Sequence, residues 1–306
     1  MNGNVTLLQL SDALADTVQS AGEAVALVDA RRRRPASGVL IRPGVILTAD
    51  HTVEREEGIR VLLSGGREMT ARLAGRDPGT DLAVLRLSED AGPAAKLASG
   101  EPRVGQMALA LGRPAEDGVQ ASLGIISAIR RPMRGRGGTL EKVLRTDAIP
   151  MPGFSGGPLV NGTGEVIGLN TSGMAHGVLI AIPIQEAVRI ADVLLEHGRI
   201  PRGYLGVRSQ VVELSDAVRT SLGRKQYTGL LLVNIEPESP ASRGGLLVGD
   251  ILVGLDGEPV ATSDDLAVRL TSSRAGQPSQ VQVVRGGQPQ QITVTIGESR
   301  RVQLPG

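Results

Sequence analysis

Three short segments of this chain carry, in the order His, Asp and Ser, the side chains that can turn a serine hydroxyl into a nucleophile. The segments are Leu47–His51, Gly79–Leu85 and Gly153–Pro158, and each is flanked by residues typical of β-strands. A serine hydroxyl is a weak nucleophile at neutral pH, so it needs a base to accept its proton and an anion to orient that base. The order of the segments therefore indicates acyl transfer at a serine.

Ser155, His51 and Asp81 are the candidate catalytic residues. Ser155 Oγ would attack a carbonyl carbon, His51 would accept its proton and pass it to the leaving amine, and Asp81 would orient the imidazole. The chain has only three histidines, which leaves few candidates for the base. The backbone N–H groups of Gly153 and Ser155 are the expected donors to the developing oxyanion, and loss of one such donor typically lowers turnover about 100- to 1,000-fold.

Two other interpretations of these segments stay open at this level. The three residues could be a core histidine and two unconnected loop residues. Gly153–Gly157 also matches the Gly-x-Ser-x-Gly turn of α/β-hydrolases, but that turn requires a helix directly after the serine and a histidine last in sequence order. Gly156–Pro158 is a poor helix start, and His197 lies on a predicted surface helix. His176 lies in a predicted loop, where contact with solvent or with a ligand would both fit.

The bulk composition excludes several classes of protein. With 306 residues the chain is long enough for two domains of roughly 100–200 residues each. A net charge of +1 and a hydrophobic content of 41% indicate a globular protein without strong attraction to polyanions, so no nucleic-acid partner is expected. The arginine runs Arg31–Arg34 and Arg130–Arg136 lack interleaved aromatic residues and are interpreted as solvated loops. No metal-ligand cluster or phosphate-binding loop is recognisable, so no metal or other cofactor is expected.

The expected compartment follows from features that the sequence lacks. Met1–Leu10 has no basic leader followed by an apolar run, and no stretch of about 18 apolar residues occurs, so neither a secretory signal nor a membrane span is predicted. The absence of cysteine suits a reducing compartment. The expected location is the cytoplasm, with the periplasm as the alternative if the sequence has been trimmed.

Hydrophobic spacing predicts an N-terminal helix (residues 1–22) followed by an all-β domain (23–200). Leucine and valine residues at helical spacing over 6–20 predict the helix, and Gly22 ends it. Short strand-like segments separated by glycine and proline fill residues 24–182, which favours a barrel or a sandwich. A second helix is predicted over 184–197.

Residues 201–306 form the predicted second domain, joined to the first by a short Pro-Arg-Gly linker. Strands are predicted over 229–235, 250–255, 281–285 and 291–296. A helix is predicted near 263–270, with Ser263 as its N-cap and two aspartates near its positive end.

Six segments of the first domain carry a family resemblance. They are Ser37–Ile41, Ile46–Val53, Asp77–Leu85, Leu123–Ala128, Arg145–Val160 and Gly164–Thr171. Together they resemble the HtrA family of trypsin-like serine proteases, and the similarity extends from about residue 36 to 298. The resemblance implies an all-β double-barrel trypsin-like protease domain, followed by a small α+β PDZ domain. It also implies that Asp81, and not Asp77, is the acid of the triad.

The resemblance further implies ATP-independent degradation of unfolded or damaged proteins, often by a homotrimer. Small or medium aliphatic residues are expected before the cut, with Val178, Leu179 and Ile180 lining the specificity pocket. Phe154 stands where the family usually has asparagine, and an exposed ring there is expected to contact substrate or a partner loop. The alternative function is a peptide-binding chaperone or adaptor with a latent protease site, in which a flipped peptide near Pro152 removes an oxyanion donor.

The second domain carries its own candidate binding segment. Tyr204, Leu205, Gly206 and Val207 resemble the carboxylate-binding loop of PDZ domains. The resemblance implies that C-terminal peptides add as a strand beside this loop, with the predicted helix as one wall of the groove.

Overall fold

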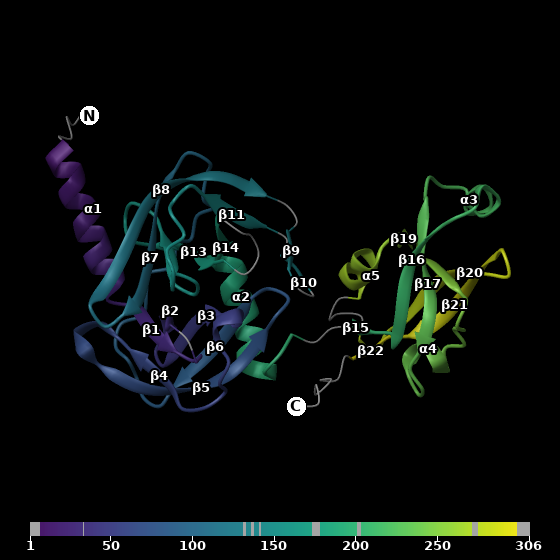
Figure 1. Cartoon of the computed structure of the whole chain (residues 1–306), viewed down its shortest axis with the longest axis horizontal. Coiled ribbons are helices and arrows are strands. Elements are labelled where there is room, and N and C mark those ends of the chain that lie inside the picture. The colour runs from purple at the N-terminus through teal and green to yellow at the C-terminus, as the bar shows by residue number, and fades with distance from the viewer. Residues whose placement is uncertain are drawn as a thin grey trace. The chain divides into compact units, whose positions relative to one another are not determined.

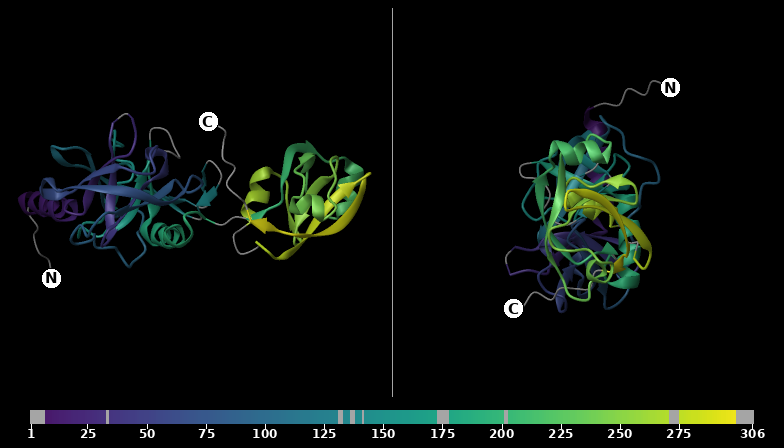
Figure 2. Two further views of the ribbon diagram at one scale, coloured as in Figure 1. Left: turned by 90° about the horizontal axis from the view of Figure 1, so that it is seen from below. Right: turned by 90° about the vertical axis from the view of Figure 1, so that its right-hand side faces the viewer.

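The computed structural model describes residues 7–32, 34–130, 133–135, 138–140, 142–172, 178–200, 203–270 and 275–298 (Figures 1 and 2). The chain divides into two compact units, Met1–Ile200 and Pro201–Gly306. The first unit contains two closed six-stranded barrels, and the second contains a six-stranded sheet, a separate two-stranded sheet and short helices. None of the helices in these ranges is long and apolar enough to cross a membrane.

The first barrel is a closed antiparallel sheet in the order β1-β2-β3-β6-β5-β4. Its strands alternate with tight turns, and their inward residues are the Val, Ile, Leu and Ala of the predicted pattern. A single 3₁₀ turn, η1 (Asp50–Thr52), follows β3, and a second, η2 (Ser64–Gly66), follows β4. The strands are β1 Val25–Asp29, β2 Ala36–Arg42, β3 Val45–Ala49, β4 Ile59–Leu62, β5 Glu68–Asp77 and β6 Leu82–Leu87.

The second barrel closes in the order β11-β14-β13-β12-β7-β8. A separate two-stranded ribbon, β9 (Met133–Gly135) with β10 (Gly138–Leu140), lies between β8 and β11 in the sequence. The barrel strands are β7 Met107–Ala115, β8 Gly118–Arg130, β11 Val143–Thr146, β12 Pro158–Val160, β13 Val166–Thr171 and β14 Leu179–Pro183. The double barrel that the resemblance implied is therefore present.

Two helices complete the first unit. Helix α1 (Leu7–Gly22) packs against β7 and β8, and α2 (Ile184–His197) ends at Gly198, whose φ of 72° allows the left-handed cap. Both helices are close to their predicted bounds. A single hydrophobic cluster joins the two barrels and α2, with buried residues that include Val39, Leu111 and Leu194. The barrels are therefore held together by aliphatic packing and by the helix that follows them.

The second unit is built on a sheet with the strand order β16-β17-β18-β20-β21. Its buried residues are again aliphatic, and Leu205 from the loop before β16 joins them. The strands are β15 Gly203–Tyr204, β16 Val207–Glu213, β17 Thr228–Ile235, β18 Ile251–Leu255, β19 Glu258–Pro259, β20 Pro278–Arg285, β21 Gln288–Thr295 and β22 Gly297–Glu298. The helices are α3 Asp216–Leu222, α4 Pro240–Arg243 and α5 Ser263–Arg269.

The N-cap of α5 differs from the prediction. The cap is Thr262, whose hydroxyl accepts the Asp265 N–H at 3.2 Å, while the Asp265 carboxylate accepts the Thr262 N–H at 2.9 Å. This reciprocal pair is a capping box, and it forms one residue before the predicted cap. Ser263 is the first residue of the helix itself.

Candidate functional site

His51 and Asp81 are brought together by two neighbouring strands. His51 lies in η1 directly after β3, and Asp81 directly precedes β6, with Ala49 paired to Leu82 across the two strands. The Asp81 carboxylate accepts a hydrogen bond from His51 Nδ1 at 2.8 Å and from the His51 backbone N–H at 2.9 Å. Because the carboxylate is at Nδ1, the Nε2 atom is left to serve as the base.

The surroundings of Asp81 hold it in place. Its φ of 57° lies in the left-handed region, and its side chain is buried, with 6% of the residue exposed. Thr171 Oγ1 from the end of β13 donates a further hydrogen bond to the carboxylate. Asp77 has a different place: its carboxylate accepts the N–H groups of Gly79 and Thr80 and closes the turn before Asp81. Asp77 thus shapes the loop, while Asp81 faces the imidazole.

Asp50, the residue before His51, links η1 to strand β5. Arg76 of β5 donates from Nε to Asp50 Oδ1 at 2.6 Å and also contacts the carbonyl oxygen of Val53. Burial raises the pKa of Asp50 above its ordinary value, although the hydrogen bond and charge of Arg76 oppose that shift. The turn that carries His51 is therefore fixed to β5 of the first barrel through Arg76.

The glycines around Ser155 are required by close backbone packing. Gly156 has φ of 86°, and a Cβ there would lie 2.1 Å from the Ser37 carbonyl oxygen. A Cβ on Gly157 would lie 2.1 Å from the Leu111 carbonyl oxygen. Ser37 belongs to the first barrel and Leu111 to the second, so the serine loop is clamped between the two barrels. This contact explains why two glycines must follow the serine.

The Ser155 hydroxyl lies next to the strand end that holds Asp81. Its Oγ is 2.9 Å from Ser172 Oγ, and Ser172 directly follows the Thr171 that donates to Asp81. The hydrogen bonds found among the described residues include none between Ser155 and His51. The three predicted catalytic residues thus converge through residues 171 and 172. Sequence reasoning gave these two no role, because a hydroxyl at the end of a strand has no distinctive spacing.

Both expected oxyanion donors are available. Gly153 has φ of 87°, and a Cβ there would lie 2.5 Å from Pro114 Cβ, so only glycine fits. Within the described part of the chain, neither the Gly153 N–H nor the Ser155 N–H donates to a protein acceptor, whereas the adjacent Phe154 N–H bonds to the Met151 carbonyl at 3.2 Å. Two unpaired N–H groups on one tight loop can bind the oxygen of a tetrahedral intermediate.

The prediction of an exposed Phe154 ring is wrong. Phe154 is 1% exposed and packs inside the second barrel among residues such as Ala110 and Leu159. A Cβ on Gly112 would lie 2.5 Å from the ring, so β7 makes room for it with a glycine. Its neighbours Gly153 and Ser155 carry the unpaired N–H groups, and the side chain between them is directed into the barrel, where the ring adds to the aliphatic core.

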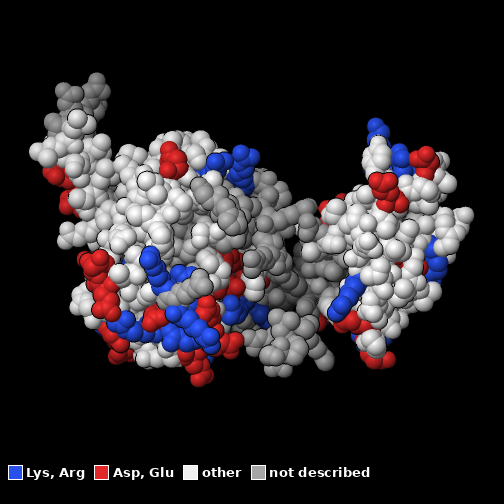
Figure 3. Space-filling model, viewed as in Figure 1, with Lys and Arg blue, Asp and Glu red and all other residues white. Residues whose placement is uncertain are grey.

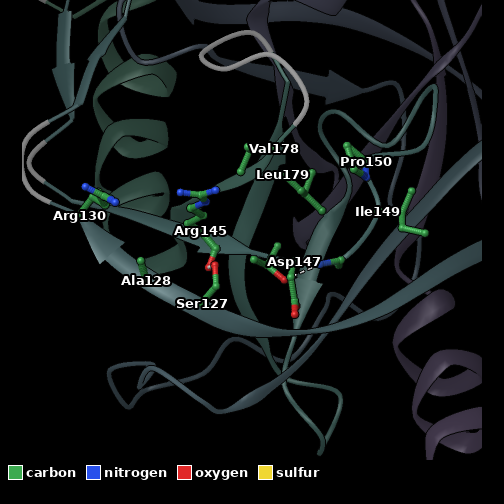
Figure 4. A pocket seen from close by; sticks show the side chains of 11 residues that line it. Ser127, Ala128, Arg130, Arg145, Asp147, Ile149, Pro150, Val178 and Leu179 are labelled. Atoms are coloured by element: carbon green, nitrogen blue, oxygen red, sulfur yellow. Dashed lines mark hydrogen bonds between the residues drawn. The ribbon is translucent and has the colours of Figure 1, made fainter.

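A cavity of about 480 Å³ opens beside the segment that leads into the serine loop (Figure 4). Val178 and Leu179 line it, as do Ile149 and Pro150 and the guanidinium-bearing Arg145. Ile180 is not among the lining residues; it is 5% exposed and pairs with Thr171 in the barrel wall. The structure thus brings two of the three predicted pocket residues to one cavity. The predicted loop histidine, His176, lies outside the described residues.

The predicted PDZ loop makes a tight turn beside an edge strand of the sheet. Gly206 has φ of 79°, and a Cβ there would lie 2.3 Å from Ser239 Cβ. Among the residues described, the N–H groups of Leu205 and Gly206 donate to no protein acceptor. Directly after the loop, β16 is an edge strand of the main sheet, and α5 contacts it. Unpaired N–H groups beside an open strand edge suit a chain terminus that adds to the sheet.

Tyr204 marks the entrance of this loop. Its hydroxyl donates a hydrogen bond to the Glu236 carboxylate, and Glu236 N–H in turn bonds to the Gly206 carbonyl at 2.9 Å. Burial, followed by the bond to Glu236, raises the pKa of Tyr204 to about 12. The protonated tyrosine hydroxyl donates to Glu236, and Glu236 in turn holds the Gly206 carbonyl of the loop.

The surface charge agrees with the near-neutral composition. On the face shown in Figure 3, Lys and Arg are interspersed with Asp and Glu. Charged side chains of the described residues also pair directly, as Arg60 does with both Glu68 and Glu116. No group of three or more His, Asp or Glu residues in the described ranges is arranged to hold a metal ion.

Known protein families match both units. The description "Trypsin-like peptidase domain" fits residues 36–169, and "PDZ domain" fits residues 203–296. A probable periplasmic serine endoprotease DegP-like from Halomonas elongata is 38% identical over 276 residues, which are 87% of this chain and 57% of the relative. A DegP-like relative from Pseudomonas savastanoi pv. phaseolicola is 37% identical over 268 residues, which are 85% of this chain and 55% of that protein. The chain thus spans little more than half the length of these curated relatives.

Solved structures match over nearly the whole chain. The HtrA-type protease AlgW with a decapeptide has a TM-score of 0.73 and 32% identity, covering 94% of this chain and 99% of that one. A serine endoprotease from Yersinia pestis has a TM-score of 0.73 and 31% identity, covering 94% of this chain and 98% of its own. The predicted double-barrel fold with a PDZ domain is confirmed by these matches.

The expected cytoplasmic location is wrong. The curated relatives from Halomonas elongata and Pseudomonas savastanoi are named periplasmic, which points to the periplasm. The first residues of the sequence and the lack of cysteine do not decide the compartment.

Proposed function

Since this chain belongs to the family of HtrA-type serine proteases with a PDZ domain, we propose that it is a serine endopeptidase that cleaves unfolded or damaged proteins without ATP. The observation that carries the proposal is the hydrogen bond of 2.8 Å between His51 Nδ1 and the buried Asp81 carboxylate, next to a serine loop with two unpaired N–H groups.

The proposed reaction gives each of these groups a defined role. When a peptide carbonyl enters the site, Ser155 Oγ exchanges its bond with Ser172 for one with His51 Nε2, a side-chain rotation that is fast on the time scale of turnover. Ser155 Oγ then bonds to the carbonyl carbon while His51 takes the hydroxyl proton. The negative charge moves to the carbonyl oxygen, which the N–H groups of Gly153 and Ser155 bind. His51 next protonates the leaving amine, and water hydrolyses the acyl-enzyme by the reverse sequence.

A comparison of wild type with Ser155→Ala tests this activity. Wild type should degrade an unfolded substrate such as casein, and Ser155→Ala should lose at least 1,000-fold in rate while staying folded, because the nucleophile is absent. Circular dichroism of both proteins controls for folding. Equal cleavage by the two would remove Ser155 from the mechanism.

A second function is favoured by one contact. Because Ser155 Oγ bonds to Ser172 and not to His51, the structure also fits a resting site in a peptide-binding chaperone or adaptor. In that case Ser155→Ala should suppress aggregation of an unfolded protein as well as wild type does, and wild type should release no cleaved fragments during the assay.

We also propose that the second unit binds C-terminal peptides through Tyr204, Leu205, Gly206 and Val207. The support is the pair of unpaired N–H groups beside the open edge of β16. The full chain carrying Ser155→Ala should bind a decapeptide ending in valine, and amidation of its C-terminus should weaken binding at least tenfold because the carboxylate is removed. Equal affinity for the acid and the amide would contradict carboxylate capture.

Assembly as a homotrimer is the last part of the proposal. Leu7 and Leu8, at the start of α1, are 86% and 70% exposed, and a second copy would cover such residues. Multi-angle light scattering would give a mass three times that of the chain; a monomer mass at micromolar concentration would contradict the trimer.

A further inference from the structure

Ser37 of β2 touches the serine loop at two points. Its N–H donates to the Ser155 carbonyl at 3.1 Å, and its Oγ donates to the Gly153 carbonyl at 2.7 Å. The residue is fully buried, with 0% exposed, and belongs to the first barrel, whereas the loop leads into the second. One residue thus holds a carbonyl on each side of Phe154, one through its backbone N–H and the other through its hydroxyl.

The two carbonyls that Ser37 holds belong to peptide units that adjoin those of the oxyanion donors. A peptide unit is planar, so the bonds to Ser37 orient the unit that joins Gly153 to Phe154 and the unit that joins Ser155 to Gly156. The Ser155 N–H belongs to the unit between these two, and the Gly153 N–H belongs to the unit directly before the first. Each donor therefore lies next to a peptide unit that Ser37 holds in place.

The Ser37 hydroxyl is itself held in one orientation. It accepts the Arg113 N–H of β7 at 2.8 Å, which leaves its own hydrogen directed at the Gly153 carbonyl. The Ser37 carbonyl accepts from Thr48 Oγ1 at 2.7 Å, and Thr48 lies on the strand that leads to His51. The strand of the base and the loop of the nucleophile therefore meet at this residue.

We propose that Ser37 is a positioning residue that keeps the Gly153 and Ser155 N–H groups aimed at the oxyanion. Ser37 acts through the loop, and removal of its hydroxyl leaves the Gly153 carbonyl and the Arg113 N–H without their partner. The proposal rests on the proposed endopeptidase function.

The test compares Ser37→Ala and Ser37→Cys with wild type in the full chain. Ser37→Cys keeps a similar volume with a much weaker donor. The matched control is Thr228→Val in the second unit, which removes a hydroxyl bonded to the Ala261 carbonyl at 3.0 Å. Both Ser37 variants should lower kcat about 10- to 100-fold with KM within about twofold, because the oxyanion is bound only after attack begins. Their affinity for a peptide boronate should fall by the same factor as kcat/KM.

Exchange of the hydrogen-bonded Phe154 and Gly156 N–H groups, measured by NMR on wild type and Ser37→Ala, gives a readout that needs no activity, because these two amides belong to the peptide units that Ser37 holds. Exchange should accelerate at least tenfold in the variant and stay unchanged in Thr228→Val. A kcat within twofold of wild type, or unaltered exchange, overturns the positioning role. Wild type that neither cleaves protein nor binds the boronate would count against the proposed function alone, since loop exchange would still decide the role of Ser37.

Discussion

Among single residues, the candidate site is built from groups that hold one another in a fixed orientation. Asp81 is buried, and its oxygens accept from the His51 ring, the His51 backbone and Thr171. A buried carboxylate needs such donors, because an unpaired charge away from water is costly. The Thr171 hydroxyl is therefore part of what holds the Asp81 carboxylate in place beside the imidazole.

Replacement of Thr171 by valine should lower kcat/KM about tenfold, since hydrogen bonds to charged groups contribute roughly 1.5–3 kcal/mol. The shape of the side chain is nearly preserved, so the effect should appear in kcat more than in KM. Steady-state kinetics on a short peptide substrate measures this, with Thr228→Val as the control. Unchanged kinetics would show that Asp81 does not depend on the threonine.

The residue types of the triad could be predicted because their chemistry restricts them, but their neighbours could not. Ser37 and Ser172 are ordinary serines in the sequence, and they matter only because the barrels bring them to the loop. The exposure of Phe154 could not be predicted for the same reason. Its ring is buried because Gly112 of β7 has no side chain and leaves room for it, and this contact is not visible in the sequence.

At the scale of elements, the predictions succeeded where the pattern was long and periodic. Helices α1 and α2 have 16 and 14 residues, and their spacing and terminal glycines identify them. Helices α3 and α4 have 7 and 4 residues, too short for a period to stand out, and they were not predicted. The strand pattern predicted over residues 24–182 does not single out β5, which pairs with both β4 and β6, because its sequence carries several charges.

Helix α5 allows a direct test of an element boundary. Thr262→Ala should destabilise the second unit by about 1 kcal/mol, because it removes the side-chain acceptor of the capping box. Ser263→Ala, one residue later, is the matched control and should have little effect. Both tyrosines, Tyr204 and Tyr227, lie in the second unit and the chain has no tryptophan, so tyrosine fluorescence during urea unfolding reports that unit alone. A larger loss of unfolding free energy in Ser263→Ala than in Thr262→Ala would contradict the observed cap.

At the scale of the whole molecule, the two units have separate cores and therefore separate stabilities. The second unit contains an ion pair in which the buried Asp250, at 1% side-chain exposure, accepts from Nε of the half-buried Arg285 at 2.7 Å. Burial alone would raise the pKa of Asp250, but the bonds from Arg285 and the Leu247 N–H together lower it. A carboxyl group whose pKa is lower in the folded state adds stability above its ordinary pKa, and this contribution is lost as the pH falls through the folded value.

Asp250→Asn should accordingly make the second unit less stable at pH 7, and the difference from wild type should narrow below about pH 4. Tyrosine-detected urea unfolding at several pH values measures this. Glu258→Gln breaks an exposed pair with Arg269 and serves as the control with a small, nearly pH-independent effect. A difference in unfolding free energy between the variant and wild type that grows as the pH falls would contradict the stabilising role of the ion pair.

We propose Ser155, activated by His51 and Asp81, as the nucleophile of this molecule. Labelling with an organofluorophosphate, followed by mass mapping, tests it most directly. The expected result is one phosphoryl group per chain on the peptide that contains Ser155, with labelling lost in His51→Ala. Modification of another residue, or protein cleavage that continues with Ser155 unlabelled, would contradict the account.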